Sequence, residues 1–390
     1  MHSQSQPLSR RKKIVFRLIL LLIPIIAIAF LYLCFTAYRT RSIYQYVKTN
    51  QRGWRGKVYK PDTELGFAPI ANSRGAEVFP IGDDVPAHFD NEGFRIPLDD
   101  GKATSPGSHP IVLALGCSFT YGSAARAEDT YPYLIGHNLD GRTKNAGVSS
   151  YGLSQMLILA QRLVPTQKPD YLLVQYSPWL VERAQSPFAP TYFGRMPTPY
   201  FFSRQNDLAL QPPVFQTQIF DLAIDQYRNT SPGFGDQLSF LWRVGLPLFL
   251  HDDFNMACYV GKRLLGRVPK PASDPDRIVK YVYGEIGKLA RENGAKLVIV
   301  VMGNDVNRVQ IQSDWFPADA IVVNAQDSLW EQLPIANQEN YEKAYAFWRG
   351  LPPRIVDNHP NENAHRLISD AVTRKILDRS DDLRTLSAPR

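Results

Sequence analysis

The sequence has few cysteines and no recognisable metal-ligand pattern. Cys34, Cys117 and Cys258 are its only cysteines among 390 residues. Their spacing fits neither a disulfide framework nor a zinc site. We therefore expect no structural metal and no cofactor, and cysteine usage leaves the cellular compartment open.

Signatures of nucleic-acid binding are also missing. A formal net charge of +7 would suit such a partner, but no zinc finger, Gly-Lys phosphate loop or RNA-binding motif occurs. The basic residues instead concentrate before Lys60, on both sides of an apolar segment. A basic stretch next to a membrane attracts anionic lipid headgroups. We expect a lipid bilayer as partner and no nucleic acid, and the sequence names no protein partner.

Charge is absent from residues 18–38, LILLLIPIIAIAFLYLCFTAY. About 20 such residues cross the hydrocarbon core as a helix, so we predict a transmembrane anchor at residues 14–38 after a basic cytoplasmic tail at residues 1–13. A buried core helix and a cleaved signal peptide are the alternatives. Basic residues flank both ends, but the tight cluster before the run favours a cytoplasmic N-terminus. This predicts a single-pass inner-membrane protein with a periplasmic domain.

The rest of the chain has a globular composition, with 44% hydrophobic and 21% charged residues. No internal repeats occur. Residues 39–106 are predicted to form a juxtamembrane stalk and lead-in, followed by one domain at residues 107–390. Strands are predicted at residues 111–115, 144–147, 171–176, 296–302 and 355–356, and helices at 131–139, 153–164, 276–292 and 362–377. This alternation predicts a parallel sheet covered on both faces, a three-layer α/β/α domain. The segment at about 184–275, which is rich in aromatic residues and proline, is interpreted as an insertion that forms either a substrate-facing cap or a structural flap.

Candidate catalytic residues follow two of the predicted strands. Ser118 lies just after the strand at 111–115, and functional groups gather beyond the carboxyl ends of parallel strands. A serine hydroxyl becomes nucleophilic only when a base takes its proton. Asp357 and His359 follow the last strand, and a carboxylate can orient a histidine for that task. The alternative is that Asp357 only caps the final helix, which does not explain the histidine.

Other histidines fit less well. His365 shares a helical face with Ile368 and Val372, so we interpret it as a packed core or supporting histidine. His88 and His251 lie in segments whose sequence is typical of loops, and the sequence identifies no partner residues for them.

Four segments together resemble the conserved blocks of bacterial SGNH/GDSL hydrolases. The first is IVLALGCSFTYGSAARAEDTYPYLI from Ile111, and the second is NAGVSSYG from Asn145. The third, PDYLLVQYSPW, and the last, DNHPNENAHRLI, follow in family order. FDNEGFRIP, from Phe89, is similar to a lead-in of envelope members.

The resemblance implies roles for individual residues. Ser118 would be the nucleophile, His359 the base and Asp357 its orienting acid. The oxyanion hole would use the backbone N–H groups of Ser118 and Ser150 and an Asn side chain of the third block. That Asn is missing here, since Trp179 follows VQYSP. The candidate replacements are Asn304, which follows the next strand, and alternatively Ser177 or the indole N–H of Trp179.

Three further positions depart from the family pattern. Cys117 replaces an Asp that supports the loop, Ser150 replaces a Gly, and Ala364 replaces the Gly before the final histidine. The resemblance implies a flavodoxin-like three-layer fold and a membrane-anchored serine esterase or deacetylase that removes acyl groups from an envelope glycan or lipid. The alternatives are an O-acyltransferase acting on a polysaccharide with the same triad, and a degenerate domain that serves as a structural or binding subunit of a membrane complex.

Overall fold

The computed structural model describes residues 9–50, 53–79, 81–98, 109–191, 194–205, 207–221, 234–304 and 308–387. Its centre is a nine-stranded sheet with the order β1-β4-β5-β6-β8-β7-β9-β14-β15. Five of these strands, β8 to β15 in that order, pair in parallel. They are β7 (Ile111–Leu115), β8 (Arg142–Asn145), β9 (Tyr171–Tyr176), β14 (Lys296–Val301) and β15 (Ile321–Asn324).

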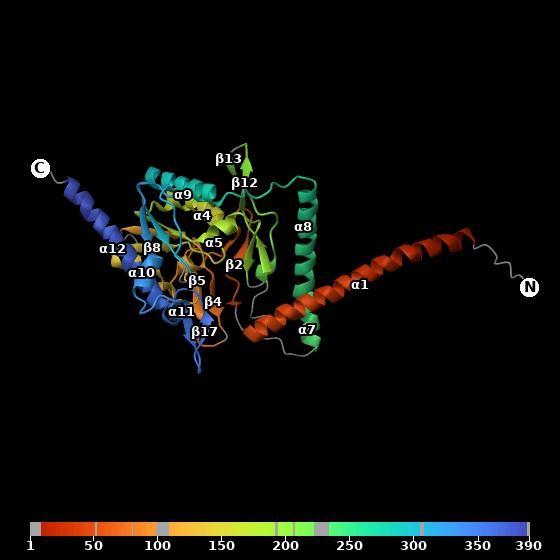
Figure 1. Ribbon diagram of the computed structural model, residues 1–390. Helices are drawn as coiled ribbons and strands as arrows, with labels where there is room; N and C mark the ends of the chain where they lie inside the picture. Colours follow the sequence, from red (N-terminus) through yellow and green to blue (C-terminus); the bar gives the residue numbers. More distant parts are fainter. Residues whose placement is uncertain are drawn as a thin grey trace, which may run out of the picture.

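Helices cover both faces of the parallel strands (Figure 1). One layer contains α3 (Tyr131–Asn138), α10 (Ala325–Glu331) and α12 (Glu362–Ser387). The other contains α4 (Leu153–Gln167), α5 (Pro178–Ala184) and α9 (Pro275–Glu292). Because both faces are covered, β7 is buried at every position, as expected for a central parallel strand. The predicted three-layer α/β/α fold is confirmed.

Two details of the predicted sheet need correction. The strand predicted at 355–356 is β17 (Arg354–Asp357), which pairs antiparallel with β16 (Phe347–Arg349) in a small separate sheet. The fifth parallel strand is instead β15, which the sequence analysis did not identify. It has four residues, of which two are buried and two partly buried, so its hydrophobic pattern is too short to be recognised.

The segment predicted as a stalk, residues 39–106, contributes to the fold wherever the structure describes it. Four of its strands extend the main sheet in antiparallel fashion. These are β1 (Gly53–Arg55), β4 (Arg74–Val78), β5 (Val85–Phe89) and β6 (Arg95–Ile96). The strands β2 (Tyr59–Asp62) and β3 (Gly66–Pro69) form a hairpin beside them. Strands of two to five residues carry too little periodicity to be recognised alone. Residues 51–52, 80 and 99–106 of this segment lie outside the described residues.

The segment predicted as an insertion, at about 184–275, is built from hairpins followed by helices. The hairpins are β10 (Phe188–Thr191) with β11 (Gly194–Pro197), and β12 (Tyr200–Arg204) with β13 (Asp207–Gln211). A 3₁₀ turn, η3 (Ile219–Asp221), follows them. The described helical part comprises α7 (Phe234–Phe240), the π-helical turn η4 (Leu241–Gly245) and α8 (Leu246–Leu264).

The N-terminal helix α1 (Arg10–Asn50) extends away from the domain (Figure 1). Its part Arg10–Ser42 is long and apolar enough to cross a membrane, with a mean hydropathy of 3.0 in its most apolar window. That window is not buried by the rest of the protein. Residues 1–8 of the predicted cytoplasmic tail lie outside the described residues.

Candidate active site

Ser118 is the first residue of the short helix α2 (Ser118–Tyr121), directly after β7. The chain turns at Gly116, where a side chain would collide with those of Thr120 and Gln175. This close approach requires glycine. The turn exposes only 8% of Ser118 and directs it into a pocket beyond the carboxyl end of the sheet.

Gln175, near the carboxyl end of β9, holds this turn in place. Its Oε1 accepts hydrogen bonds from the Cys117 N–H (3.0 Å) and the Thr120 hydroxyl (2.8 Å). Its Nε2 donates to Cys117 Sγ (3.2 Å) and to Ser177 Oγ (2.9 Å). All donors and acceptors of this fully buried amide are thus used. The sequence analysis missed Gln175, although a Gln inside the apolar strand YLLVQY was a signal that it has polar partners.

Arg95 supports the other end of α2. This fully buried side chain comes from β6, within the FDNEGFRIP segment. Its guanidinium donates to the carbonyls of Tyr121, Gly122 (2.8 Å) and Ala125 (2.7 Å). A cation at the carboxyl end of a helical turn compensates the carbonyl groups left without partners there. Arg95 therefore braces the turn that carries Ser118.

Asp357 and His359 form a close pair at the end of β17. His359 Nδ1 lies 2.5 Å from Asp357 Oδ1, and the same oxygen accepts the backbone N–H of His359 at 2.7 Å. The Asp357 side chain is completely buried, whereas the His359 side chain is 15% exposed. An aspartate that accepts from Nδ1–H places the lone pair of the neutral ring on Nε2, which makes Nε2 the basic nitrogen.

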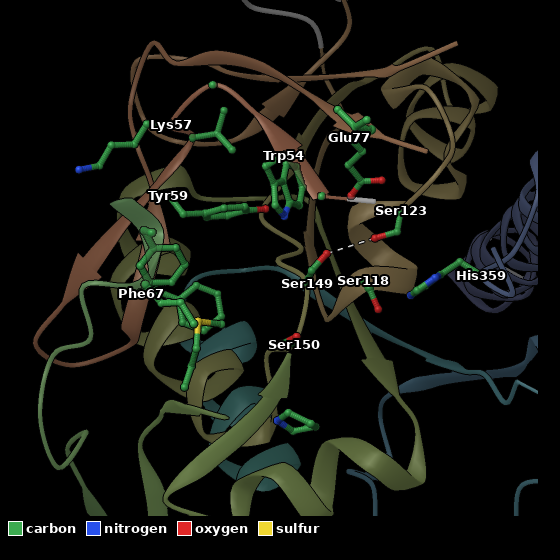
Figure 2. Close-up of a pocket in the computed structure, with 18 of the residues that line it drawn as sticks. Trp54, Lys57, Tyr59, Phe67, Glu77, Ser118, Ser123, Ser149, Ser150 and His359 are labelled. Atoms are coloured by element: carbon green, nitrogen blue, oxygen red, sulfur yellow. Dashed lines mark hydrogen bonds between the residues drawn. The ribbon is translucent and has the colours of Figure 1, made fainter. Parts of the chain in front are cut away.

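Ser118 and His359 line the same cavity of about 370 Å³. Figure 2 shows the His359 ring directed toward Ser118. The Phe119 ring contacts the His359 ring edge-on, with 5.3 Å between centroids, which keeps the two segments together. The structure therefore brings all three predicted triad residues to one site.

Much of the cavity wall is aromatic or aliphatic. It comes from the segment after α1, from the β2–β3 hairpin, from the insertion and from η3. The apolar lining residues are Trp54, Val58, Tyr59, Phe67, Val78, Phe79, Pro190, Met196, Ile219 and Phe220. All of these positions belong to segments that the sequence analysis had assigned to a stalk or an insertion.

The second block contributes Ser149 and Ser150 to the cavity wall. Ser150 has φ = 69°, a left-handed conformation that glycine adopts without strain. This conformation suits the Gly that the resemblance to SGNH/GDSL hydrolases leads one to expect at this position. Asn145, which opens the block, donates to the Thr120 carbonyl (2.9 Å) and so connects the loop to α2.

The structure does not bring the candidates for the third oxyanion donor together at Ser118. Asn304 is exposed at the end of β14 and is not among the residues that line the cavity. The Ser177 hydroxyl donates to the Met302 carbonyl (2.8 Å) and is committed to holding two strands together. The Trp179 indole N–H points to Cys117 Sγ at 3.5 Å.

Cys117, at the position where the resembled SGNH/GDSL pattern has an Asp, acts as a buried hydrogen-bond acceptor. Burial raises the pKa of its thiol, but the nearby charge of Arg183 opposes this. Hydrogen bonds from Trp179, from the Phe119 N–H and from Gln175 act in the same direction as Arg183, and the net pKa is lowered. Hydrogen-bond donors that would stabilise an aspartate carboxylate at this position therefore stabilise the Cys117 sulfur instead.

A second carboxyl, Glu77, also lines the cavity. Burial raises the pKa of Glu77, although the Arg95 charge and a hydrogen bond from the Ala124 N–H (2.8 Å) oppose the shift. The Glu77 carboxyl also interacts electrostatically with Asp357 and His359. Glu77 does not hydrogen-bond to His359 Nδ1, whose partner is Asp357.

His365 lies in the core, as its helical pattern predicted. It is fully buried and stacked on Tyr131, whose backbone N–H donates to His365 Nδ1 at 3.2 Å. Burial, together with the charges of Arg95 and His359, lowers the pKa of His365 to about 3. If the His365 ring were protonated, its Nδ1 would also carry a hydrogen. Two N–H donors, that of Nδ1 and that of Tyr131, would then face each other.

This depressed pKa predicts acid sensitivity. The unfolded chain binds a proton at His365 near pH 6.5 and the folded chain does not, so stability is present above pH 6.5 and is lost as pH falls toward 3. We expect His365→Gln, which cannot be protonated, to lose about 2 kcal/mol less unfolding free energy than wild type between pH 6.5 and pH 5. Urea unfolding at both pH values measures this. Equal losses in the two proteins would contradict it.

Comparisons with known proteins found distant structural likenesses only. No protein-family model matches the chain, and no curated protein matches its sequence. Among solved structures, a protein described as lipolytic and of the G-D-S-L family from Desulfitobacterium hafniense DCB-2 is 10% identical, with a TM-score of 0.33 over 68% of this chain and 99% of that one. TesA is 10% identical, with a TM-score of 0.31 over 68% and 97%.

A catalytic mutant of Axe2, an acetylxylan esterase from Geobacillus stearothermophilus, is 13% identical, with a TM-score of 0.35 over 69% of this chain and 95% of that one. The GDSL hydrolases that the sequence blocks resemble are therefore found among the structural neighbours. The roles of individual residues are therefore argued from the geometry of this chain.

Proposed function

We propose that the protein is a membrane-anchored serine esterase that removes acyl groups from an envelope glycan or lipid. The observation that carries this proposal is the Asp357–His359 pair directed at Ser118 within one largely apolar cavity. A structural or binding subunit would not need a buried carboxylate oriented toward a histidine beside a serine. The arrangement fits nucleophilic catalysis.

The chemistry follows from this geometry. His359 Nε2 removes the proton of Ser118 Oγ as the oxygen attacks the ester carbonyl, and Asp357 stabilises the imidazolium that forms. The proton then passes to the leaving alcohol, which leaves an acyl group on Ser118. Water, activated by His359, hydrolyses this acyl-enzyme and restores the serine.

The backbone N–H groups of Ser118 and Ser150 are the proposed oxyanion donors, and Asn304 is left out because of its exposed position. Losing a true donor costs about two to three orders of magnitude in rate. We expect Asn304→Ala to change kcat by less than about threefold, well short of that cost. Steady-state hydrolysis measures this. A hundredfold loss without a change in folding would return Asn304 to the oxyanion hole.

The cavity supports an apolar acyl group as the bound part of the substrate. Its aromatic walls offer few hydrogen-bond partners for a sugar ring, and its volume of about 370 Å³ suits a moderate acyl chain. Ligand pockets commonly measure about 300–1,000 Å³. Arg183 and Lys57 also line it and offer positive charge to an anionic headgroup or glycan.

Contacts of α1 with the domain support its role as a retained anchor. The Asp253 carboxylate of α8 accepts from Arg39 (2.7 Å) and from the Tyr32 hydroxyl (3.0 Å). Gly245 packs so closely on Thr40 that a side chain would collide with it. A cleaved signal peptide has no reason for such a fit. The basic residues before the apolar run favour a domain outside the cytoplasm.

Hydrolysis of esters by the detergent-purified full chain tests the proposal. We expect cleavage of p-nitrophenyl esters, faster for butyrate or hexanoate than for acetate, because the longer chains bury more apolar surface in the cavity. Product analysis with an added oligosaccharide separates hydrolysis from transfer, since transfer would acylate a sugar hydroxyl. Absence of any cleavage or transfer would contradict the proposal.

A further inference from the structure

The helix α8 crosses α1 near the end of the apolar run. Asp253 of α8 binds both Tyr32 and Arg39, and the Arg39 guanidinium lies 3.8 Å from the centroid of the Phe249 ring. At 1.5 Å per residue, Tyr32 lies about 27 Å and Arg39 about 38 Å along the helix from residue 14, where the predicted span begins. Since the hydrocarbon core is about 30 Å thick, the crossing falls at the boundary between lipid and water.

One face of α8 is exposed and apolar although it belongs to a folded domain. This outer face consists of Leu250, Phe254, Ala257, Cys258, Leu264 and Leu265. The spacing places these residues on one side of the helix, and none is charged. Phe254 is 70% exposed and Leu265 is 69% exposed. A soluble surface rarely presents such a stripe without a partner.

The opposite face of α8 is attached to the domain. Leu248 and Tyr259 are buried, and the Tyr259 ring contacts Phe188 of β10. Asp252 accepts a hydrogen bond from the Thr217 hydroxyl at 2.6 Å. Figure 1 shows α8 between the body of the domain and the part of α1 that extends away from it. The outer face is therefore on the side where a bilayer crossed by α1 would lie.

Basic residues border the outer face. Lys262, which lies beside Cys258 by helical spacing, and Arg267, just beyond the carboxyl end of α8, are exposed. An apolar stripe with basic neighbours is the pattern of helices that lie in the interface of anionic membranes. A second copy of this chain would gain nothing from the added positive charge facing its own.

We propose that the outer face of α8 lies in the headgroup region of the same bilayer that α1 crosses, as a second membrane contact made by the insertion. This inference rests on the proposed membrane anchoring. It goes beyond it because the catalytic domain itself, and not only its anchor, binds lipid.

The contact also determines how the cavity meets the bilayer. Asp252 holds Thr217, whose hydroxyl accepts the Ile219 N–H at 3.1 Å, and Ile219 lines the cavity. On the other side, Tyr259 supports β10, which contributes Pro190 to the lining. A helix fixed on the membrane surface thus holds two parts of the cavity wall beside lipid. An acyl ester carried by a membrane amphiphile is the substrate class that this arrangement favours.

Cys258 offers a direct test, since it is exposed on the outer face. The full chain with Cys34→Ser is labelled at Cys258 with the dye NBD and reconstituted into vesicles of phosphatidylcholine and phosphatidylglycerol. We expect a blue-shifted emission and quenching by lipids that carry a nitroxide near the headgroup. The control carries NBD at Ile335→Cys in a Cys34→Ser, Cys258→Ser background, because Ile335 is 65% exposed and lies far from α8 in the chain.

Equal emission and quenching at the two sites would overturn the inference. A blue shift at Cys258 that depends on protein density and not on quencher lipid would also overturn it, and would assign the face to a second copy.

Activity separates this inference from the proposed function. We expect Phe254→Glu with Leu265→Glu to lower hydrolysis of a vesicle-borne ester by about tenfold, because the charges disfavour membrane docking. Hydrolysis of a soluble ester should change by less than about twofold, since neither residue lines the cavity. The pair Ile335→Glu with Leu351→Glu, which charges apolar residues of similar or greater exposure, should alter neither reaction.

If the wild-type protein hydrolysed neither ester, the esterase proposal would be refuted. The NBD measurement would still test the lipid contact. Equal rates of both variants on vesicles would refute the lipid contact while leaving the esterase intact.

Discussion

Replacing Ser118 with alanine is expected to lower ester hydrolysis by roughly four to six orders of magnitude, because no acyl-enzyme can form. Labelling by a fluorophosphonate, which reacts only with an activated serine, should disappear in the same variant. The physical reason is the position of Ser118 beside a histidine whose other nitrogen is held by a buried carboxylate.

Ser123→Ala is the matched control for this substitution. Ser123 lines the same cavity, but its hydroxyl is engaged with Ser149 at 3.1 Å (Figure 2). This variant should retain both labelling and hydrolysis. Equal labelling of wild type and Ser118→Ala would show that another residue reacts, and the catalytic assignment would fail.

Asp357→Asn is expected to lower kcat by about four orders of magnitude with little change in KM. The amide cannot hold His359 with its proton on Nδ1, so the ring presents a donor instead of a base to Ser118, and no charge stabilises the imidazolium. Single-turnover hydrolysis at neutral pH measures the loss.

Glu77→Gln serves as the comparison, because it removes another buried cavity carboxyl without changing the partner of His359 Nδ1. We expect its rate to fall by less than about tenfold, since only a neighbouring field changes. If both variants lost activity equally, Asp357 would have no special orienting role, and the two carboxyls would act only through the local field.

The site residues were predictable where chemistry and local pattern coincide. Ser118 follows an apolar strand through a glycine turn, and Asp357 and His359 stand two residues apart at the mouth of a helix. The sequence analysis expected parallel strands to bring these segments to one edge of the sheet. Because β17 belongs to a small antiparallel sheet instead, packing of the whole chain brings Asp357 and His359 to Ser118. Gln175 and Arg95 were not assigned roles, because their partners are backbone and side-chain groups far away in the sequence.

The residues of the cavity wall could not be predicted from local sequence either. Trp54 and Phe67 lie in segments without a clear period, and they become walls only because the short strands β1 to β4 fold against the parallel sheet and its insertion. Asn304 shows the reverse case, in which a suggestive Gly-Asn-Asp after a strand ends in an exposed position. Its strand lies beyond β9 from Ser118, and strand order is not written in local sequence.

What the sequence by itself determined is the set of local properties: an apolar helix long enough for a bilayer, buried parallel strands, and a serine, an aspartate and a histidine at strand ends. These follow from hydrophobic pattern and turn chemistry, which act over a few residues. The tertiary structure alone decided which buried groups brace Ser118, which segments enclose the cavity, and that α8 meets α1 at the level of Tyr32 and Arg39. Those contacts join residues separated by tens to hundreds of positions, and only packing of the whole chain brings them together.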